Sequence, residues 1–121
     1  MSHPNLLILY VADPAASSTF YQGLLQKAPT DSFPNYVAFV LTDQLSLGLW
    51  SEQAANFRSA GSGHRFEVGY MVETKAQVEQ LYARWQALGV SIEQPLARAV
   101  FGLTFVALDP DGHRLRVCTR D

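Results

Sequence analysis

Near its start the chain reads Leu6-Leu7-Ile8-Leu9-Tyr10-Val11, and about sixty residues later it reads Glu67-Val68-Gly69-Tyr70-Met71-Val72. Both runs are short, largely apolar and rich in residues that favour β-strands. Each is followed within two residues by a side chain suited to cap a helix, Asp13 in the first case and Thr74 in the second. We therefore predict two copies of one structural unit, each opening with a strand and a helix.

The residues after these runs continue the repeat. Apolar spacing predicts helices over residues 15–26 and 74–88, and Phe20-Tyr21 aligns with Leu81-Tyr82. Further on, Ala38-Phe39-Val40 aligns with Thr104-Phe105-Val106. A period this long exceeds that of solenoid arrays and indicates a pseudo-twofold duplication. Strands are predicted over 36–41, 45–50, 65–72, 91–98, 102–108 and 114–119, and 29–34 is predicted to be a polar break.

A turn at Asp109-Pro110-Asp111-Gly112 joins the last two predicted strands. Proline fixes φ near −65° there, and glycine accepts a positive φ. The pattern predicts an α+β fold of two pseudo-symmetric βαβββ modules within one domain, residues 1–121. The first module covers about 5–51, a linker about 52–64, and the second module about 65–120.

Composition excludes several classes of protein. Of 121 residues, 48% are hydrophobic and 17% charged, which suffices for a core without disulfides. The net charge is −2 and no basic run occurs, so neither nucleic acid nor a membrane is expected as partner. The single cysteine, Cys118, fits a reducing compartment. Since no signal sequence or apolar run of about 20 residues is visible, we expect a cytoplasmic protein.

The whole chain resembles the vicinal oxygen chelate superfamily of glyoxalases, bleomycin resistance proteins and dioxygenases. The resemblance rests on the paired modules, on Asp13 before a helix that carries Ser17 and Phe20-Tyr21, and on Asp109-Pro110-Asp111-Gly112-His113. It implies that each module curls its mixed sheet into a half-open cup, and that a second copy of the chain completes the cups as a homodimer. Four segments are most similar to phenazine antibiotic resistance proteins: Tyr36-Val37-Ala38-Phe39, Leu49-Trp50-Ser51, Val100-Phe101-Gly102 and Arg116-Val117-Cys118.

The superfamily's metal positions, carried over by strand register, fall on Leu6, Glu67 and Arg116, and near Gly48. A divalent ion needs several His, Glu or Gln donors within roughly 2.0 to 2.5 Å. One carboxylate with a leucine, a glycine and a guanidinium does not supply such a set. We therefore expect no metal, no other cofactor and no catalytic residue at these positions.

The predicted cup floor offers ligand-binding candidates instead. Trp50 shares strand parity with Gly48 and Ser46, so its indole can form a flat wall on which an aromatic ring stacks. The alternative is a tryptophan of the core or of an interface. Phe101 lies in a connection between two strands and is either a pocket wall or part of a dimer seam.

Three candidates belong to the second module. The alternation of residues along its predicted strand points the side chain of Arg116 into the cup. A charged group in such a position needs a partner of opposite charge or a hydrogen-bonding partner. Arg116 either pairs with Glu67 or binds a ligand carboxylate, unless it simply faces solvent. Cys118 shares the parity of Arg116 and could line the same cup.

Three functions of different kinds remain. The leading hypothesis is non-catalytic, metal-free sequestration of a planar, anionic aromatic molecule such as a phenazine antibiotic. The alternative is a metal-dependent glyoxalase-like lyase or dioxygenase whose ligands have moved to His64, Glu67 or His113. A third is a structural dimer whose cups are filled by its own side chains.

Overall fold

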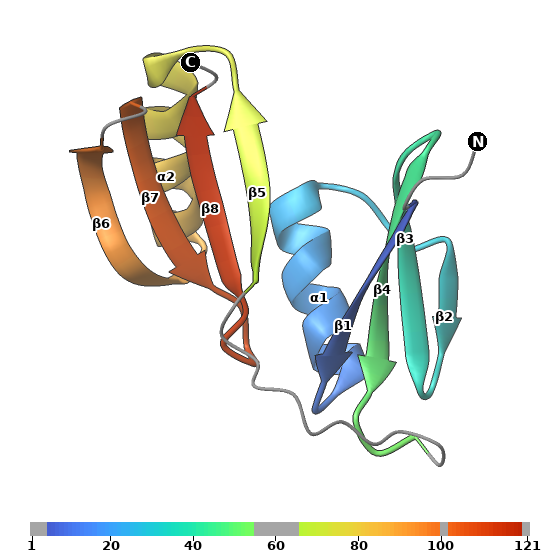
Figure 1. The fold of residues 1–121 in the computed structure, drawn as a ribbon. Coiled ribbons are helices and arrows are strands. Elements are labelled where there is room, and N and C mark those ends of the chain that lie inside the picture. The colour runs from blue at the N-terminus through green and yellow to red at the C-terminus, as the bar shows by residue number, and fades with distance from the viewer. Residues whose placement is uncertain (1–4, 55–65, 100–101, 120–121) are drawn as a thin grey trace. The chain divides into compact units, whose positions relative to one another are not determined.

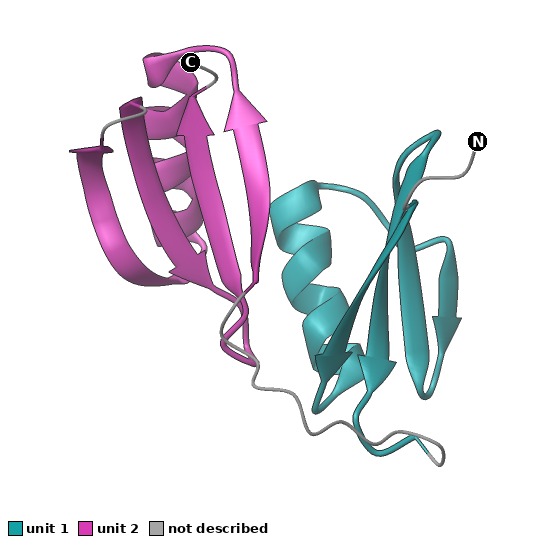
Figure 2. Ribbon diagram, viewed as in Figure 1, with its two compact units in different colours: residues 1–61 teal, residues 62–121 magenta. Residues whose placement is uncertain are grey.

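A computed structural model describes residues 5–54, 66–99 and 102–119 of the chain. It divides into two compact units, residues 1–61 and 62–121 (Figure 2). Each unit holds one helix and one four-stranded sheet, so the predicted α+β fold of two βαβββ modules is confirmed. The elements, shown in Figure 1, are β1 (Leu6–Val11), α1 (Pro14–Leu25), β2 (Asp31–Phe33), β3 (Tyr36–Thr42), β4 (Leu45–Ser51), β5 (Glu67–Val72), α2 (Lys75–Ala87), β6 (Ser91–Ala99), β7 (Gly102–Leu108) and β8 (Arg114–Thr119).

The two sheets share one topology. Their strand orders are β1-β4-β3-β2 and β5-β8-β7-β6. In the first sheet β1 runs parallel to its neighbour β4, and in the second sheet β5 runs parallel to its neighbour β8. The parallel ladder has six rungs in both units, from Leu6 opposite Ser46 in one and from Glu67 opposite Arg114 in the other. The duplication visible in the sequence is therefore present in the backbone hydrogen bonding.

Both helices begin where the sequence predicts a cap. The Asp13 carboxylate accepts hydrogen bonds from the backbone N–H groups of Ala15 and Ala16. Thr74 and Gln77 form a reciprocal capping box at the start of α2. Each helix packs against one face of its own sheet (Figure 1). Neither of the two helices in the described part of the chain combines the length and the apolar character that crossing a bilayer requires.

The buried side chains lie between each helix and its sheet. In the first unit the buried side chains include Tyr21, Phe39 and Leu49, all fully shielded from solvent. In the second unit Trp85 of α2 meets Phe105 of β7 edge to face, with ring centroids 5.5 Å apart. Because each helix covers one face of its sheet, the opposite face is the one available to bind a ligand or a partner.

Two local predictions are wrong. Residues 31–33, predicted to belong to a polar break, form the edge strand β2, because backbone pairing with β3 does not require apolar side chains. Leu88, the last residue of the helix predicted over 74–88, is the C-cap residue and is 49% exposed. The helix ends at Ala87, and Gly89 follows with a positive φ of 81°.

The predicted alignment of the later strands is shifted by two residues. If Leu6 corresponds to Glu67, the parallel ladders make Ser46 equivalent to Arg114. The antiparallel ladders then place Tyr36-Val37-Ala38, and not Ala38-Phe39-Val40, on Thr104-Phe105-Val106. A shift of two keeps every side chain on the same face, so apolar alternation alone does not reveal it.

Candidate functional site

The two faces of each sheet differ in burial. Along β4, Leu47 and Leu49 are buried on the face that the helix covers, whereas Gly48 and Trp50 belong to the opposite face. We call the face turned away from the helix the open face of its unit. Both open faces carry residues that the sequence singles out.

Strand register sets four aromatic side chains side by side across the open face of the first unit. Phe33 lies opposite Tyr36, Tyr36 opposite Trp50, and Trp50 opposite Tyr10. We call these four residues the aromatic row. The rings of Tyr10 and Trp50 have centroids 6.1 Å apart and planes inclined by 33°. One end of this open face is therefore a band of ring surface.

The next rung on the same face has small residues at its centre. It consists of Asp31, Ala38, Gly48 and Ile8, which we call the central row. The side chain of Tyr36 extends from the aromatic row over Gly48 of the central row. A Cβ added at Gly48 would lie 2.6 Å from the Tyr36 Oη atom. Side chains do not approach so closely, so the position of the phenol depends on the glycine.

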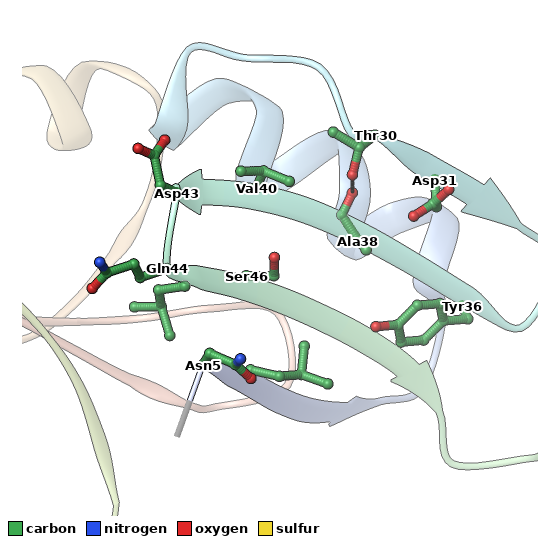
Figure 3. A pocket seen from close by; sticks show the side chains of 11 residues that line it. Asn5, Thr30, Asp31, Tyr36, Ala38, Val40, Asp43, Gln44 and Ser46 are labelled. Carbon is green, nitrogen blue, oxygen red and sulfur yellow. Dashed lines mark hydrogen bonds between the residues drawn. The ribbon is translucent and has the colours of Figure 1, made fainter. Parts of the chain in front are cut away.

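A pocket of about 350 Å³ opens beside the central row, of which only Asp31 and Ala38 line it (Figure 3). Its lining includes the carboxylates of Asp31 and Asp43 but no Lys or Arg side chain. The phenol of Tyr36 occupies one end of it. Such a lining suits a neutral or hydrogen-bond-donating group better than an anion. The lining residues are Asn5, Leu6, Thr30, Asp31, Tyr36, Ala38, Val40, Asp43, Gln44, Leu45 and Ser46.

The open face of the second unit carries an ion pair. Arg116 Nε donates to Glu67 Oε1 at 2.7 Å, and Arg116 Nη2 donates to Glu67 Oε2 at 3.1 Å. A third donor, Nη1, reaches Thr104 Oγ1 at 3.2 Å. The hydrogen bond from Arg116 lowers the pKa of Glu67, and the same contact raises the pKa of Arg116, with burial opposing both changes. Both side chains stay charged at neutral pH.

A second pocket, of about 450 Å³, lies beside this ion pair. Arg98 and Arg116 line it together with one carboxylate, Glu93, whose Oε1 lies 2.9 Å from Arg114 Nε. The balance of charge favours an anionic group here, in contrast to the pocket of the first unit. The lining residues are Glu93, Gln94, Pro95, Ala97, Arg98, Ala99, Thr104 and Arg116.

His113 serves the closing turn. The buried Asp109 carboxylate accepts hydrogen bonds through Oδ1 from the N–H groups of Asp111 and His113, and its Oδ2 lies 2.8 Å from His113 Nδ1. This contact raises the pKa of His113, although partial burial opposes the rise. The imidazole is held within the turn.

The predicted site residues form two groups, one on each open face. Ser46, Gly48 and Trp50 share the open face of the first unit, where Ser46 lines the pocket and Gly48 lies beneath Tyr36. Glu67, Arg116 and Cys118 share the open face of the second unit; Cys118 lies opposite Met71 and Thr104 in register. Phe101 and His64 lie outside the described residues. The contact between Arg116 and Glu67 is one of the three alternatives that the sequence left open for Arg116.

Sequence reasoning missed Tyr36 and Tyr10 as site residues. The hairpin register around residues 42–44, extended to Trp50, would have placed Tyr36 directly opposite the indole. The parallel pairing of β1 with β4 then adds Tyr10 on the other side.

The positions that correspond to metal ligands in the superfamily do not fit a metal ion. Leu6 and Gly48 offer no side-chain donor, and both oxygens of Glu67 already accept hydrogen bonds from Arg116. A fixed guanidinium beside the only carboxylate of the set repels a cation. Among residues 5–54, 66–99 and 102–119, no three His, Cys, Asp or Glu side chains gather closely enough to hold one.

A duplicated βαβββ fold with a ligand-sized pocket on the open face of each unit defines a protein of the vicinal oxygen chelate type. A model of the Glyoxalase/Bleomycin resistance protein/Dioxygenase superfamily matches residues 3–117, and the chain belongs to this superfamily.

Relatives extend over nearly the whole chain. This chain is 34% identical to the phenazine antibiotic resistance protein EhpR of Enterobacter agglomerans, and the alignment covers 98% of this chain and 92% of that protein. The solution NMR structure of protein ATC0852 from Agrobacterium tumefaciens is 43% identical with a TM-score of 0.87, covering 100% of this chain and 99% of the other. A glyoxalase-related enzyme from Fulvimarina pelagi shares the fold, with a TM-score of 0.83 at 20% identity, covering 99% and 89% of the two chains.

Proposed function

We propose that this protein binds and sequesters a planar aromatic molecule of the phenazine class, without a metal and without changing it chemically, and so protects against it. The aromatic row beside the small central row is the observation that carries this proposal. A flat molecule on the central row gains contact below it and aromatic edges or faces beside it. The likeness to a phenazine resistance protein supports the same ligand class.

Binding on this surface rests on apolar contact and stacking. Ring pairs contribute about 0.5 to 1.5 kcal/mol beyond the burial of area, and burial adds about 25 cal/mol for each Å² removed from water. Tyr10, 41% exposed, and the partly exposed Trp50 keep ring surface available for such contacts. No step of this mechanism requires an activated water or a nucleophile.

Arg116 is proposed to orient ligands that carry a negative charge. Its guanidinium lines the second pocket while it is held by Glu67. An incoming carboxylate shares this cation with Glu67, so the gain is smaller than for an unpaired arginine. We expect a preference for anionic ligands that is modest in size.

The first prediction concerns Trp50. Calorimetric titration with unsubstituted phenazine should show that Trp50→Ala loses at least about tenfold in affinity, because the ring face is removed while the strand remains. Trp50→Phe is the matched control and should retain most of the affinity. Quenching of tryptophan fluorescence gives a second readout, since the other tryptophan, Trp85, is only 1% exposed.

Charge selectivity is tested in the same titrations. Arg116→Ala should lower the affinity for phenazine-1-carboxylate more than the affinity for unsubstituted phenazine. A wild-type protein that binds neither compound at millimolar concentration would contradict the proposed function. Equal affinity of Trp50→Ala and wild type would remove Trp50 from the site.

A homodimer is part of the proposal. Several apolar residues of the first unit's open face are exposed, among them Phe33 at 61% and Leu6 at 44%. Exposed apolar surface of this kind is typical of an interface or a ligand site. Sedimentation should show a particle of twice the 13.4 kDa chain mass, and a purely monomeric protein would contradict this part.

A further inference from the structure

We propose that Tyr36, seated on Gly48, selects which planar molecules the first unit accepts, by offering its hydroxyl to a ring nitrogen or ring-bound oxygen. This inference rests on the proposed function and deepens it. It concerns a residue pair on β3 and β4 rather than the indole of Trp50.

The first step of the argument is how closely the phenol approaches the strand. A Cβ at Gly48 would meet three atoms of Tyr36: Oη at 2.6 Å, Cε1 at 2.9 Å and Cζ at 3.0 Å. All three belong to the outer edge of the ring, so this edge lies directly against the backbone of β4. Any other residue at position 48 would push the phenol away.

The second step is the direction of the hydroxyl. Tyr36 lines the 350 Å³ pocket, and its Oη points into the part of it where Ala38 and Ser46 lie (Figure 3). Within the described part of the chain this oxygen has no protein hydrogen-bond partner. A half-buried phenol that keeps its hydrogen-bonding capacity can use it for a ligand.

The third step is the geometry that a flat ligand would have. A ring system lying in the pocket over Ala38 and Ser46 meets the hydroxyl of Tyr36 at its edge, in or near the ring plane. The lone pairs of a ring nitrogen lie in that plane and accept a hydrogen bond, whereas an edge C–H does not. A site built for such a bond discriminates against an analogue that lacks the acceptor, since the hydroxyl is then left unpaired against the edge of the ligand.

Tyr36→Phe tests this selection directly. The probes are unsubstituted phenazine and anthracene, which have the same shape and no charge but differ in the two ring nitrogens. Wild type should prefer the phenazine by about 2- to 10-fold, and Tyr36→Phe should lose this preference while binding the anthracene unchanged. Equal preference in both proteins would overturn the inference.

Gly48→Ala tests the seating of the phenol. The added methyl should remove the preference for phenazine over anthracene, whatever it does to the affinity for both, because the displaced hydroxyl no longer meets the ring nitrogens. Gly69→Ala is the matched control, because Gly69 also lies in a strand on an open face but has nothing within 4 Å of its would-be Cβ. A Gly48→Ala protein that keeps the wild-type preference for phenazine would overturn the seating.

The titrations separate this inference from the function beneath it. If wild type binds neither probe, the proposed function fails and this inference fails with it. If wild type binds both probes equally well, sequestration of planar rings stands and the role of Tyr36 is wrong.

Discussion

The two units of this protein have one backbone and two different open faces. Both sheets have the same strand order and a six-rung parallel ladder, and in both units the helix-capping residue stands two positions after the end of the first strand. On the first open face the register assembles rings and small residues. On the second it assembles an ion pair between Glu67 and Arg116. The fold is thus repeated while the chemistry is not.

Equivalent positions show how this difference arises. The parallel ladders make Gly48 equivalent to Arg116, and Trp50 equivalent to Cys118. Where one unit has no side chain and leaves room for Tyr36, the other has a long cation that lies across its strands to Glu67 and Thr104. A duplicated scaffold can therefore carry a stacking surface in one unit and a charged surface in the other.

The largest effect is expected in the cores, where the second unit has an indole at a position that holds an aliphatic side chain in the first. Counted from the capping residues, Leu24 of α1 occupies the place of Trp85 in α2. Trp85→Ala should destabilise the protein by about 3 to 5 kcal/mol, because it removes edge-to-face contacts with Tyr70 and Phe105 and leaves a cavity. Leu24→Ala, 8% exposed in the wild type, should cost about 2 to 3 kcal/mol.

Urea unfolding followed by far-ultraviolet circular dichroism measures both variants. A smaller loss for Trp85→Ala than for Leu24→Ala would show that the second core does not depend on the indole. It would contradict the predicted difference between the two cores.

A smaller effect distinguishes the two hairpin turns. Asp109 is 5% exposed and its carboxylate holds three nitrogen contacts in the turn between β7 and β8, whereas Asp43 in the turn between β3 and β4 is exposed. Asp109→Ala should therefore lower the free energy of unfolding by about 1 to 3 kcal/mol, because buried donors lose their acceptor. Asp43→Ala should change it by less than about 0.5 kcal/mol. Equal urea midpoints for the two variants would refute this distinction.

Much of this architecture could be predicted from local signals. Thr74 followed by Gln77 marks a helix start, and Asp109-Pro110-Asp111-Gly112 marks a turn, because each satisfies backbone groups within a few residues. β2 could not be found this way, since its polar residues form a strand only through pairing with β3. Strand alternation also placed Ser46, Gly48 and Trp50 on one face, because parity is a local property.

The contacts within the site could not be predicted to the same extent. Parity states which face Tyr36 occupies but not that its ring leans across to Gly48, which depends on side-chain rotamers and on neighbouring strands. The choice of Glu67 as partner for Arg116 depends on the pairing of β5 with β8, which are separated by a helix and two strands.

The smallest expected effect concerns that ion pair, the feature that most separates the second open face from the first. Glu67 and Arg116 keep 31% and 23% of their side-chain surfaces exposed, so a double-mutant cycle with Glu67→Gln and Arg116→Gln should give a coupling of about 0.2 to 1 kcal/mol. The control is a second double-mutant cycle, with Glu67→Gln and Arg114→Gln. Its coupling energy should be smaller, because Arg114 Nη1 lies 4.0 Å from Glu67 Oε2. The hydrogen bond from Arg116 lowers the pKa of Glu67 below its ordinary 4.5. The coupling energy should therefore be fully present at pH values above 4.5 and should vanish as the pH falls through the folded-state pKa of Glu67. A coupling energy that persists after the carboxylate is protonated would mean that packing, and not charge, joins these two side chains. The two open faces would then differ in packing alone.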